Sequence, residues 1–270
     1  MTAPAIDLTG VLRPVRQGNA FEETVERLLT VIKLGLVGPG ERFPAERDLA
    51  TQLGISRLTL REAIHELHEA GYVCSRRGRL GGTFVTYDRP TPNSADLRRL
   101  ARRDADKLTD ALIFRVAVEA GAAEALAVQF GSGASVGTVA GRRAAADGAG
   151  SPGAEADGAA GLAARDTLLA RLADVNSAGP DDYRRLDTLF HLSIAELTGS
   201  SLLATAAAEA RMRLNDLLNA IPVLPRNIAH AAGQHAAIVE AVLAGDADRA
   251  RREVAEHLEG TAALLRGFLA

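Results

Sequence analysis

The chain has 270 residues, 47% of them hydrophobic, so it is long enough to bury one large core or two ordinary ones. Its formal net charge of −3 creates no global positive field, so any binding of nucleic acid must come from locally placed arginines. The single cysteine excludes an intrachain disulfide and fits a reducing cytosol, and no stretch approaches the roughly 18 consecutive apolar residues of a membrane span. We therefore expect a cytoplasmic protein that does not enter the membrane.

The first 87 residues predict three helices followed by a hairpin, after a loose arm over residues 1–20. The helices are expected at 21–34, 45–53 and 57–70. Two short β runs follow, at 72–75 and 83–87. The loop between them is rich in glycine and contains Arg76, Arg77 and Arg79. This order is typical of a winged helix-turn-helix, whose positive wing tip could contact a phosphate or a minor groove.

The helix expected at 57–70 has one apolar face and one basic face. Apolar side chains repeat at i, i+3, i+4 and i+7, namely Leu60, Ala63, Ile64 and Leu67. The other face carries Arg57, Thr59 and Arg61 near the start of the helix, where Ser56 is a suitable N-cap. A helix that buries one side and presents arginines near its N-terminus is suited to the major groove of DNA, so we expect DNA contacts from Ser56, Arg57, Thr59 and Arg61.

Beyond the hairpin, a polar segment with two prolines predicts a linker over 88–107. The pattern is then helical almost throughout, so we expect an all-helical bundle over 108–268. Its helices are expected at 108–130, 162–174, 181–197, 201–220, 226–244 and 247–268. Residues 131–160 are rich in Gly, Ala and Ser, and we interpret them as a mobile, low-complexity insertion. The predicted fold class is mainly α, with a winged helix-turn-helix domain at 21–87.

Four residues of the second half have the spacing of a metal site. Asp187 and His191 stand at i and i+4, so both project from one helix face. His235 and His257 lie at nearly equal distances from a helical turn expected at Gly245, which would bring their imidazoles to one level of two antiparallel helices. One carboxylate and three imidazoles suit a divalent transition metal with positions left open. On spacing alone, histidines satisfied within a core remain the alternative.

Three stretches of the first 87 residues carry a recognisable motif. They are Leu36-x-Gly38-x-Gly40-x-x-Phe43-Pro44-x-Glu46-Arg47-x-Leu49-Ala50, then Gly54-Ile55-Ser56-Arg57 with Leu60-Arg61-Glu62-Ala63, and Gly81-Gly82-Thr83-Phe84-Val85. These residues resemble the DNA-binding domain of the GntR family of bacterial transcription regulators. The resemblance implies DNA contacts from residues of the second and third helices and an approach of the wing to the minor groove. The implied residues are Arg47, Arg57 and Arg61, with Arg77, Gly78 and Arg79 in the wing.

The arginines and Leu58 limit what this resemblance implies. Each arginine has a plainer alternative as part of a solvated helix face, and Arg47 could instead brace the helix-turn-helix through an ion pair. Leu58 departs from the family, where a polar residue is frequent, so an operator sequence cannot be transferred from relatives.

The second half contains a further set of motifs, namely Arg115-x-x-x-Glu119, Asp187-x-x-x-His191, Thr198-Gly199, and His235-x-x-Ile238-x-x-Ala241-x-x-x-Gly245-Asp246 followed by His257. They resemble the FCD ligand-binding domain of the FadR subfamily, an all-helical bundle. The resemblance implies that the Asp and the three His bind Zn, Ni or a similar ion. Ser200 departs from the family, which usually has Asn after Thr-Gly.

Arg115 has two interpretations that the sequence leaves open. Its guanidinium could form a bidentate contact with the carboxylate of an effector, or it could pair with Glu119 on its own helix. Arg211 and Arg213 are weaker candidates for the same pocket.

These features favour a homodimeric transcription regulator, most simply a repressor, rather than an enzyme. Two winged domains would bind the half-sites of a palindromic operator in double-stranded DNA. A small organic acid, bound at the metal and Arg115, would shift the population away from the DNA-competent dimer. Two alternatives stay open: a metal-dependent enzyme with an ancillary DNA-binding domain, and a regulator whose metal is purely structural.

Overall fold

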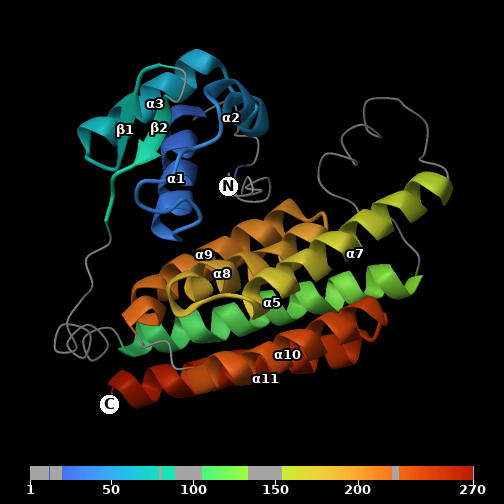
Figure 1. Ribbon diagram of the computed structural model, residues 1–270. Helices are drawn as coiled ribbons and strands as arrows, with labels where there is room; N and C mark the ends of the chain where they lie inside the picture. The colour runs from blue at the N-terminus through green and yellow to red at the C-terminus, as the bar shows by residue number, and fades with distance from the viewer. Residues whose placement is uncertain are drawn as a thin grey trace. The chain divides into compact units, whose positions relative to one another are not determined.

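The computed structural model describes residues 12, 20–78, 81–88, 105–132, 154–220 and 225–269. The chain divides into two compact units, Met1–Pro90 and Thr91–Ala270. Helices dominate both units (Figure 1), so the predicted mainly α fold class is confirmed. Arg79 and most residues of the expected arm over 1–20, the linker over 88–107 and the insertion over 131–160 lie outside the described residues.

The first unit consists of three helices and an antiparallel pair of strands. Its elements are α1 (Ala20–Lys33), α2 (Glu46–Leu53), α3 (Arg57–Glu69), β1 (Val73–Arg76) and β2 (Gly82–Val85). Helix α3 contacts α1, α2 and β1, and the strands pair in a register that joins Val73 to Val85 and Arg76 to Gly82. The structure therefore contains the predicted winged helix-turn-helix, with each element boundary within two residues of the expected one.

Local chemistry sets the turn between α2 and α3. Gly54 ends α2 with a φ of 64°, a left-handed conformation that costs a glycine little because it has no Cβ. Ser56 then caps α3, and its Oγ accepts a hydrogen bond from the Thr59 N–H at 3.0 Å. The apolar face of α3 is buried as predicted, and consists of Leu60, Ala63, Ile64 and Leu67. The opposite face of α3 is thereby left exposed.

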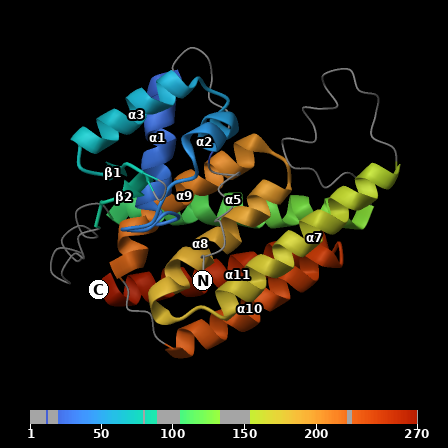
Figure 2. The same ribbon diagram turned by 45° about the horizontal axis from the view of Figure 1, so that its top comes forward.

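The second unit is a bundle of helices around α5. The described helices are α5 (Ala105–Ser132), α7 (Ala154–Asn176), α8 (Pro180–Leu197), α9 (Ser201–Ala220), α10 (Pro225–Leu243) and α11 (Ala247–Leu269). Helix α5 contacts α8, α9, α10 and α11, and Figure 1 shows it between the α8–α9 pair and the α10–α11 pair. In the turned view of Figure 2, α10 and α11 again run side by side. None of the helices in the described ranges is long and apolar enough to cross a bilayer.

Helix α7 begins at Ala154, not at residue 162 as the periodicity predicted. The added first turns are rich in alanine, which has the highest intrinsic helix propensity, so they are helical without large apolar side chains. The prediction of an insertion that reaches residue 160 was therefore wrong at its C-terminal end.

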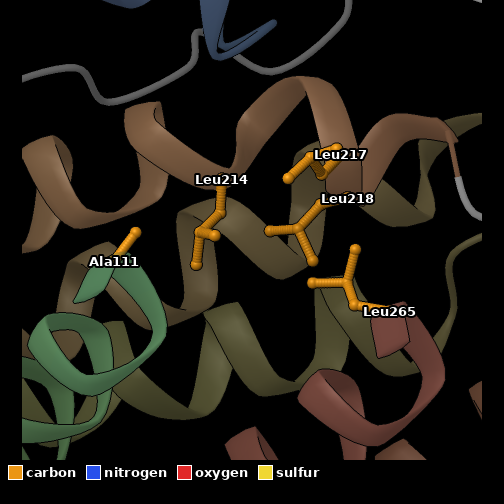
Figure 3. Close-up of a cluster of buried hydrophobic side chains, with 5 residues drawn as sticks. All are labelled: Ala111, Leu214, Leu217, Leu218 and Leu265. Carbon is orange, nitrogen blue, oxygen red and sulfur yellow. The ribbon is translucent and has the colours of Figure 1, made fainter. Parts of the chain in front are cut away.

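Close packing connects α5 with the C-terminal helices. The side chains of Ala111, Leu214, Leu217, Leu218 and Leu265 form a buried cluster from α5, α9 and α11 (Figure 3). At the other end of α5, a Cβ on Gly245 would lie 2.5 Å from Gly131 Cα, so this approach requires glycine. Gly245 also has a φ of 73° and ends α10, as predicted. The turn makes α10 and α11 antiparallel, which places their histidines at one level.

Candidate functional site

Asp187, His191, His235 and His257 converge inside the helical unit. The first two come from α8, the third from α10 and the fourth from α11. One potential ligand atom from each residue lies within 4.8 Å of those of the other three. All four residues are buried, and His235 is completely inaccessible to solvent. The structure thus brings together all four residues that the sequence predicted as metal ligands.

The imidazole Nε2 atoms face one another and one carboxylate oxygen. His191 Nε2 lies 3.2 Å from His257 Nε2 and 3.7 Å from Asp187 Oδ1. His235 Nε2 lies 3.4 Å from the same oxygen. Four donor atoms of the types that transition metals prefer therefore surround one point in the bundle.

The outer nitrogens of two histidines lie close to oxygen atoms. His191 Nδ1 lies 2.8 Å from Glu119 Oε2, and His257 Nδ1 lies 3.0 Å from Gln234 Oε1. With these partners the Nδ1 atoms carry the protons, so the Nε2 lone pairs point into the cluster. Two lone pairs that face each other at 3.2 Å repel unless a proton or a cation lies between them. The donor set therefore fits a metal ion.

Protonation states agree with this assignment. Burial and the charge of Arg211 lower the pKa of His191 to about 4, although Glu119 opposes the change. Burial also holds the pKa of His257 well below its usual range. Burial alone would raise the pKa of Asp187, but Arg211 and the neighbouring histidines keep it well below its usual range. At neutral pH His191 and His257 thus offer neutral imidazoles and Asp187 an ionised carboxylate, the forms that coordinate metals.

Arg211 fixes the orientation of Asp187. Its Nη1 and Nη2 both donate to Asp187 Oδ2 at 3.0 Å, and Nη1 also donates to Thr188 Oγ1 at 3.0 Å. The other carboxylate oxygen, Oδ1, is left to face the histidines. Arg211, expected near an effector, therefore contacts a candidate metal ligand directly.

Arg115 pairs with Glu119 on its own helix, which is one of the two interpretations that the sequence left open. Its Nε donates to Glu119 Oε1 at 2.8 Å, with only 2% of Arg115 and 4% of Glu119 exposed. Glu119 thus joins the arginine to His191 through its two oxygens. The Nη1 of Arg115, however, is buried without a hydrogen-bond acceptor among the described residues. This donor is available to an anionic ligand.

Arg213 is not part of this cluster. It is exposed and donates to Glu209 Oε1 on its own helix at 2.6 Å. Two positions along an α-helix turn the side chain by about 200°, so Arg211 and Arg213 face opposite sides of α9. The structure does not support the predicted place of Arg213 in the effector pocket.

Sequence reasoning missed two polar partners in this site and predicted only one of the two contacts of a third. Thr188 and Gln234 stand directly beside predicted ligands in the sequence, where no spacing signal marks them as functional. Glu119 was predicted only as a partner for Arg115. Ser200, which replaces the usual Asn, has a local role, because its Oγ accepts from the Leu203 N–H at 3.3 Å and caps α9.

The second candidate site is the exposed face of α3 with the wing. Arg57 is exposed and makes no ion pair with any residue that the structure describes, while Arg61 Nε donates to Glu46 Oε2 at 2.9 Å. Thr59 is half-buried in the first turn, and Leu58 is 68% exposed beside it. This face thus presents polar and apolar side chains together.

The remaining predicted DNA contacts lie on α2 and in the wing. Arg47 projects from α2 with its Nε 3.2 Å from Asp48 Oδ1, so its ion pair is with a sequence neighbour and does not brace α3. Arg77 and Gly78 are exposed after β1, and Gly78 has a φ of 103° that suits a glycine in the wing turn.

Two family models match the chain. Residues 21–85 match the model described as bacterial regulatory proteins, gntR family, and residues 143–260 match the model described as FCD domain. The first range contains the helix-turn-helix and both strands. The second contains all four clustered residues, although Arg115 and Glu119 precede it.

The chain is also similar to individual proteins. Over 262 residues the chain is 29% identical to the "Putative L-lactate dehydrogenase operon regulatory protein" of Escherichia coli (strain K12), covering 92% of this chain and 86% of that protein. It is 41% identical over 66 residues to the HTH-type transcriptional repressor NagR of Bacillus subtilis (strain 168), covering 24% of this chain and 26% of that protein. Among solved structures, E. coli McbR/YncC covers 92% of this chain and 97% of its own at 18% identity, with a TM-score of 0.48. With a gntR-type DNA-binding domain followed by an FCD domain on one polypeptide, the chain belongs to the GntR family of bacterial transcription regulators.

Proposed function

We propose that this regulator is a repressor that binds a palindromic operator as a homodimer and is controlled by a metal-bound small carboxylate in its FCD domain. The convergence of Asp187, His191, His235 and His257 within 4.8 Å carries the proposal. Zn, Ni or a similar divalent ion would be held by Asp187 Oδ1 and the three Nε2 atoms. When bound, it would supply positive charge and free coordination positions for an anionic ligand.

Charge balance supports an anionic effector. Without a metal, the buried arginines Arg115 and Arg211 are matched by the buried carboxylates Glu119 and Asp187. A divalent ion adds two positive charges to a largely buried site, and buried charge is costly unless it is paired. A carboxylate would offset part of that charge and could accept a hydrogen bond from the free Nη1 of Arg115.

DNA binding would use the exposed face of α3 and the wing. Arg57 and Arg61 would enter the major groove, Arg47 would contact DNA from α2, and the wing around Arg77 would approach the minor groove. The exposed Leu58 offers an apolar surface suited to a thymine methyl group. A homodimer would place two such faces on the half-sites of a palindrome. The effector would act by stabilising one arrangement of the dimer over the other.

Repression is supported by relatives of the DNA-binding domain. NagR of Bacillus subtilis and the mannosyl-D-glycerate system regulator MngR of E. coli are both named repressors, although each alignment covers about a third of this chain or less. A lactate-like acid is the first effector to test, because the E. coli relative is named for an L-lactate dehydrogenase operon.

A purely structural metal is the second candidate role for the site. It is favoured by the burial of all four candidate ligands, since structural metal sites are typically closed. In that case the ion would hold α8, α10 and α11 together, and small acids would not change DNA binding. Removal of the metal would then unfold the helical unit.

A binding titration separates these candidates. The metal-loaded protein first selects a preferred duplex from a random library. Fluorescence anisotropy then measures its Kd with and without small mono- and dicarboxylates, including L-lactate. We expect one class of acid to weaken binding at least tenfold in the wild type and much less in Arg115→Lys, which lacks the bidentate fork. If no acid changes the Kd and chelation unfolds the protein, the metal is structural.

A further inference from the structure

We propose that Glu46 is a positioning residue for base recognition, which holds Arg61 so that its two terminal nitrogens meet a guanine end-on. The inference rests on the proposed DNA binding and concerns how one arginine of α3 reads a base. It assigns a role to a residue of α2 that does not itself need to touch DNA.

The geometry of the pair leaves one edge of the guanidinium free. Arg61 Nε donates to Glu46 Oε2 at 2.9 Å, which links α2 and α3 across the helix-turn-helix. The Nη1 and Nη2 of Arg61 have no partner among the residues that the structure describes. These two nitrogens present parallel N–H groups, and guanine offers O6 and N7 as paired acceptors in the major groove. The Glu46 carboxylate therefore occupies Nε, which prevents side-on recognition of a base through Nε and one terminal nitrogen. End-on recognition of a base through both terminal nitrogens remains available.

Stability is a poor explanation for this ion pair. The side chains of Arg61 and Glu46 are 59% and 38% exposed, and exposed pairs of this kind contribute little to folding. A long arginine side chain, however, loses rotamer freedom when it binds, and a preformed orientation reduces that cost. Glu46 also places a negative charge near the DNA phosphates, which weakens non-specific attraction. Glu46 should therefore strengthen recognition of the guanine by Arg61 and weaken binding to DNA of any sequence.

The other arginines provide an internal comparison. Arg57 makes no ion pair within the described ranges, so nothing described fixes its guanidinium before binding. Arg47 pairs with Asp48, but both residues lie on α2 and the Arg47 side chain is 83% exposed. Asp48 therefore matches Glu46 in charge and helix, without contacting the recognition helix.

The test uses the duplex that the wild type selects from a random library. The Kd is measured for this duplex, for the same duplex with 7-deazaguanine at each guanine in turn, and for random-sequence DNA. In the wild type, loss of N7 at one guanine should weaken binding about tenfold, and Arg61→Ala should abolish that sensitivity. Glu46→Ala should also abolish it, while affinity for random DNA stays the same or rises.

Two further variants make the result decisive. Glu46→Asp keeps the charge but is one methylene shorter, so we expect it to lose the guanine discrimination as well. Asp48→Ala should retain the discrimination, and circular dichroism should show that all variants are folded. If Glu46→Ala and Glu46→Asp discriminate the guanine as well as the wild type does, Glu46 does not position Arg61. If the wild type selects no sequence at all, the proposed DNA binding itself is wrong.

Discussion

The imidazoles of His191 and His257 face each other through Nε2 atoms 3.2 Å apart, and the Nδ1 atom of each ring lies close to an oxygen atom. Glu119 holds the first ring and Gln234 the second. Two unprotonated nitrogens in this position repel each other in the absence of a shared proton or a cation. This arrangement of the two rings therefore supports a metal site more directly than the burial of the residues does.

Loss of the charge on Glu119 should damage both the fold and the metal site. Glu119 is 4% exposed and contacts Arg115 and His191, so Glu119→Gln leaves a buried guanidinium without its counter-charge. Breaking a buried pair in this way costs about 3–5 kcal/mol, and loss of an outer partner of a metal-bound histidine weakens metal binding by roughly 10–100-fold. Urea unfolding and metal titration measure these two effects.

A matched control for this variant exists on α9. Glu209 forms an exposed pair with Arg213, so Glu209→Gln should change the free energy of unfolding by less than about 1 kcal/mol. Equal stabilities of Glu119→Gln and Glu209→Gln would show that the buried network does not stabilise the fold.

Stability of the metal-free protein should fall as the pH drops from about 6.5 to about 4. The pKa of His191 is near 6.5 in an unfolded chain, and burial lowers it to about 4 in the folded protein. Between these values the unfolded chain binds a proton that the folded chain does not, so acidification favours unfolding. The difference corresponds to about 3 kcal/mol for this one group. His257 should act in the same direction, because burial also lowers its pKa.

Urea unfolding of chelator-treated protein between pH 7 and pH 5 measures this dependence. The variant His191→Asn should show a shallower decline, because it lacks the titrating group. A free energy of unfolding that stays constant or rises as the pH falls would contradict the assigned protonation states.

Arg57→Ala should weaken binding to the selected duplex by roughly 1–3 kcal/mol more than binding to random DNA, if Arg57 reads a base. Arg57 is exposed on α3 and makes no ion pair with the described residues, so its removal should leave the fold intact. Anisotropy titrations with both DNAs give the two affinities. Equal weakening of both would identify Arg57 as a phosphate contact.

Much of the architecture could be predicted because it depends on local signals. Glycine stops, the Ser56 cap and the 3.6-residue apolar repeat determine where α2 and α3 begin and end. The i, i+4 spacing of Asp187 and His191 and the turn at Gly245 likewise bring the four candidate ligands together. The N-terminal end of α7 was missed because alanine propensity, not an apolar face, forms those turns.

The outer contacts of the site could not be predicted in the same way. Whether Arg211 or Arg213 faces Asp187 depends on the rotation of α9 about its axis, which an alanine-rich helix does not reveal. The contact between Arg61 and Glu46 joins residues 15 positions apart through side-chain conformations. Such contacts depend on tertiary packing, and no periodicity in the chain encodes them.

The metal content of purified protein tests the central claim most directly. Elemental analysis after extensive dialysis should find about one divalent transition-metal ion per chain in the wild type. His235→Ala should retain almost none, because His235 is completely buried with its Nε2 facing the cluster, while Arg213→Ala, altered on the exposed side of α9, should match the wild type. A wild type without bound metal, or a His235→Ala variant with unchanged metal content, would contradict the account.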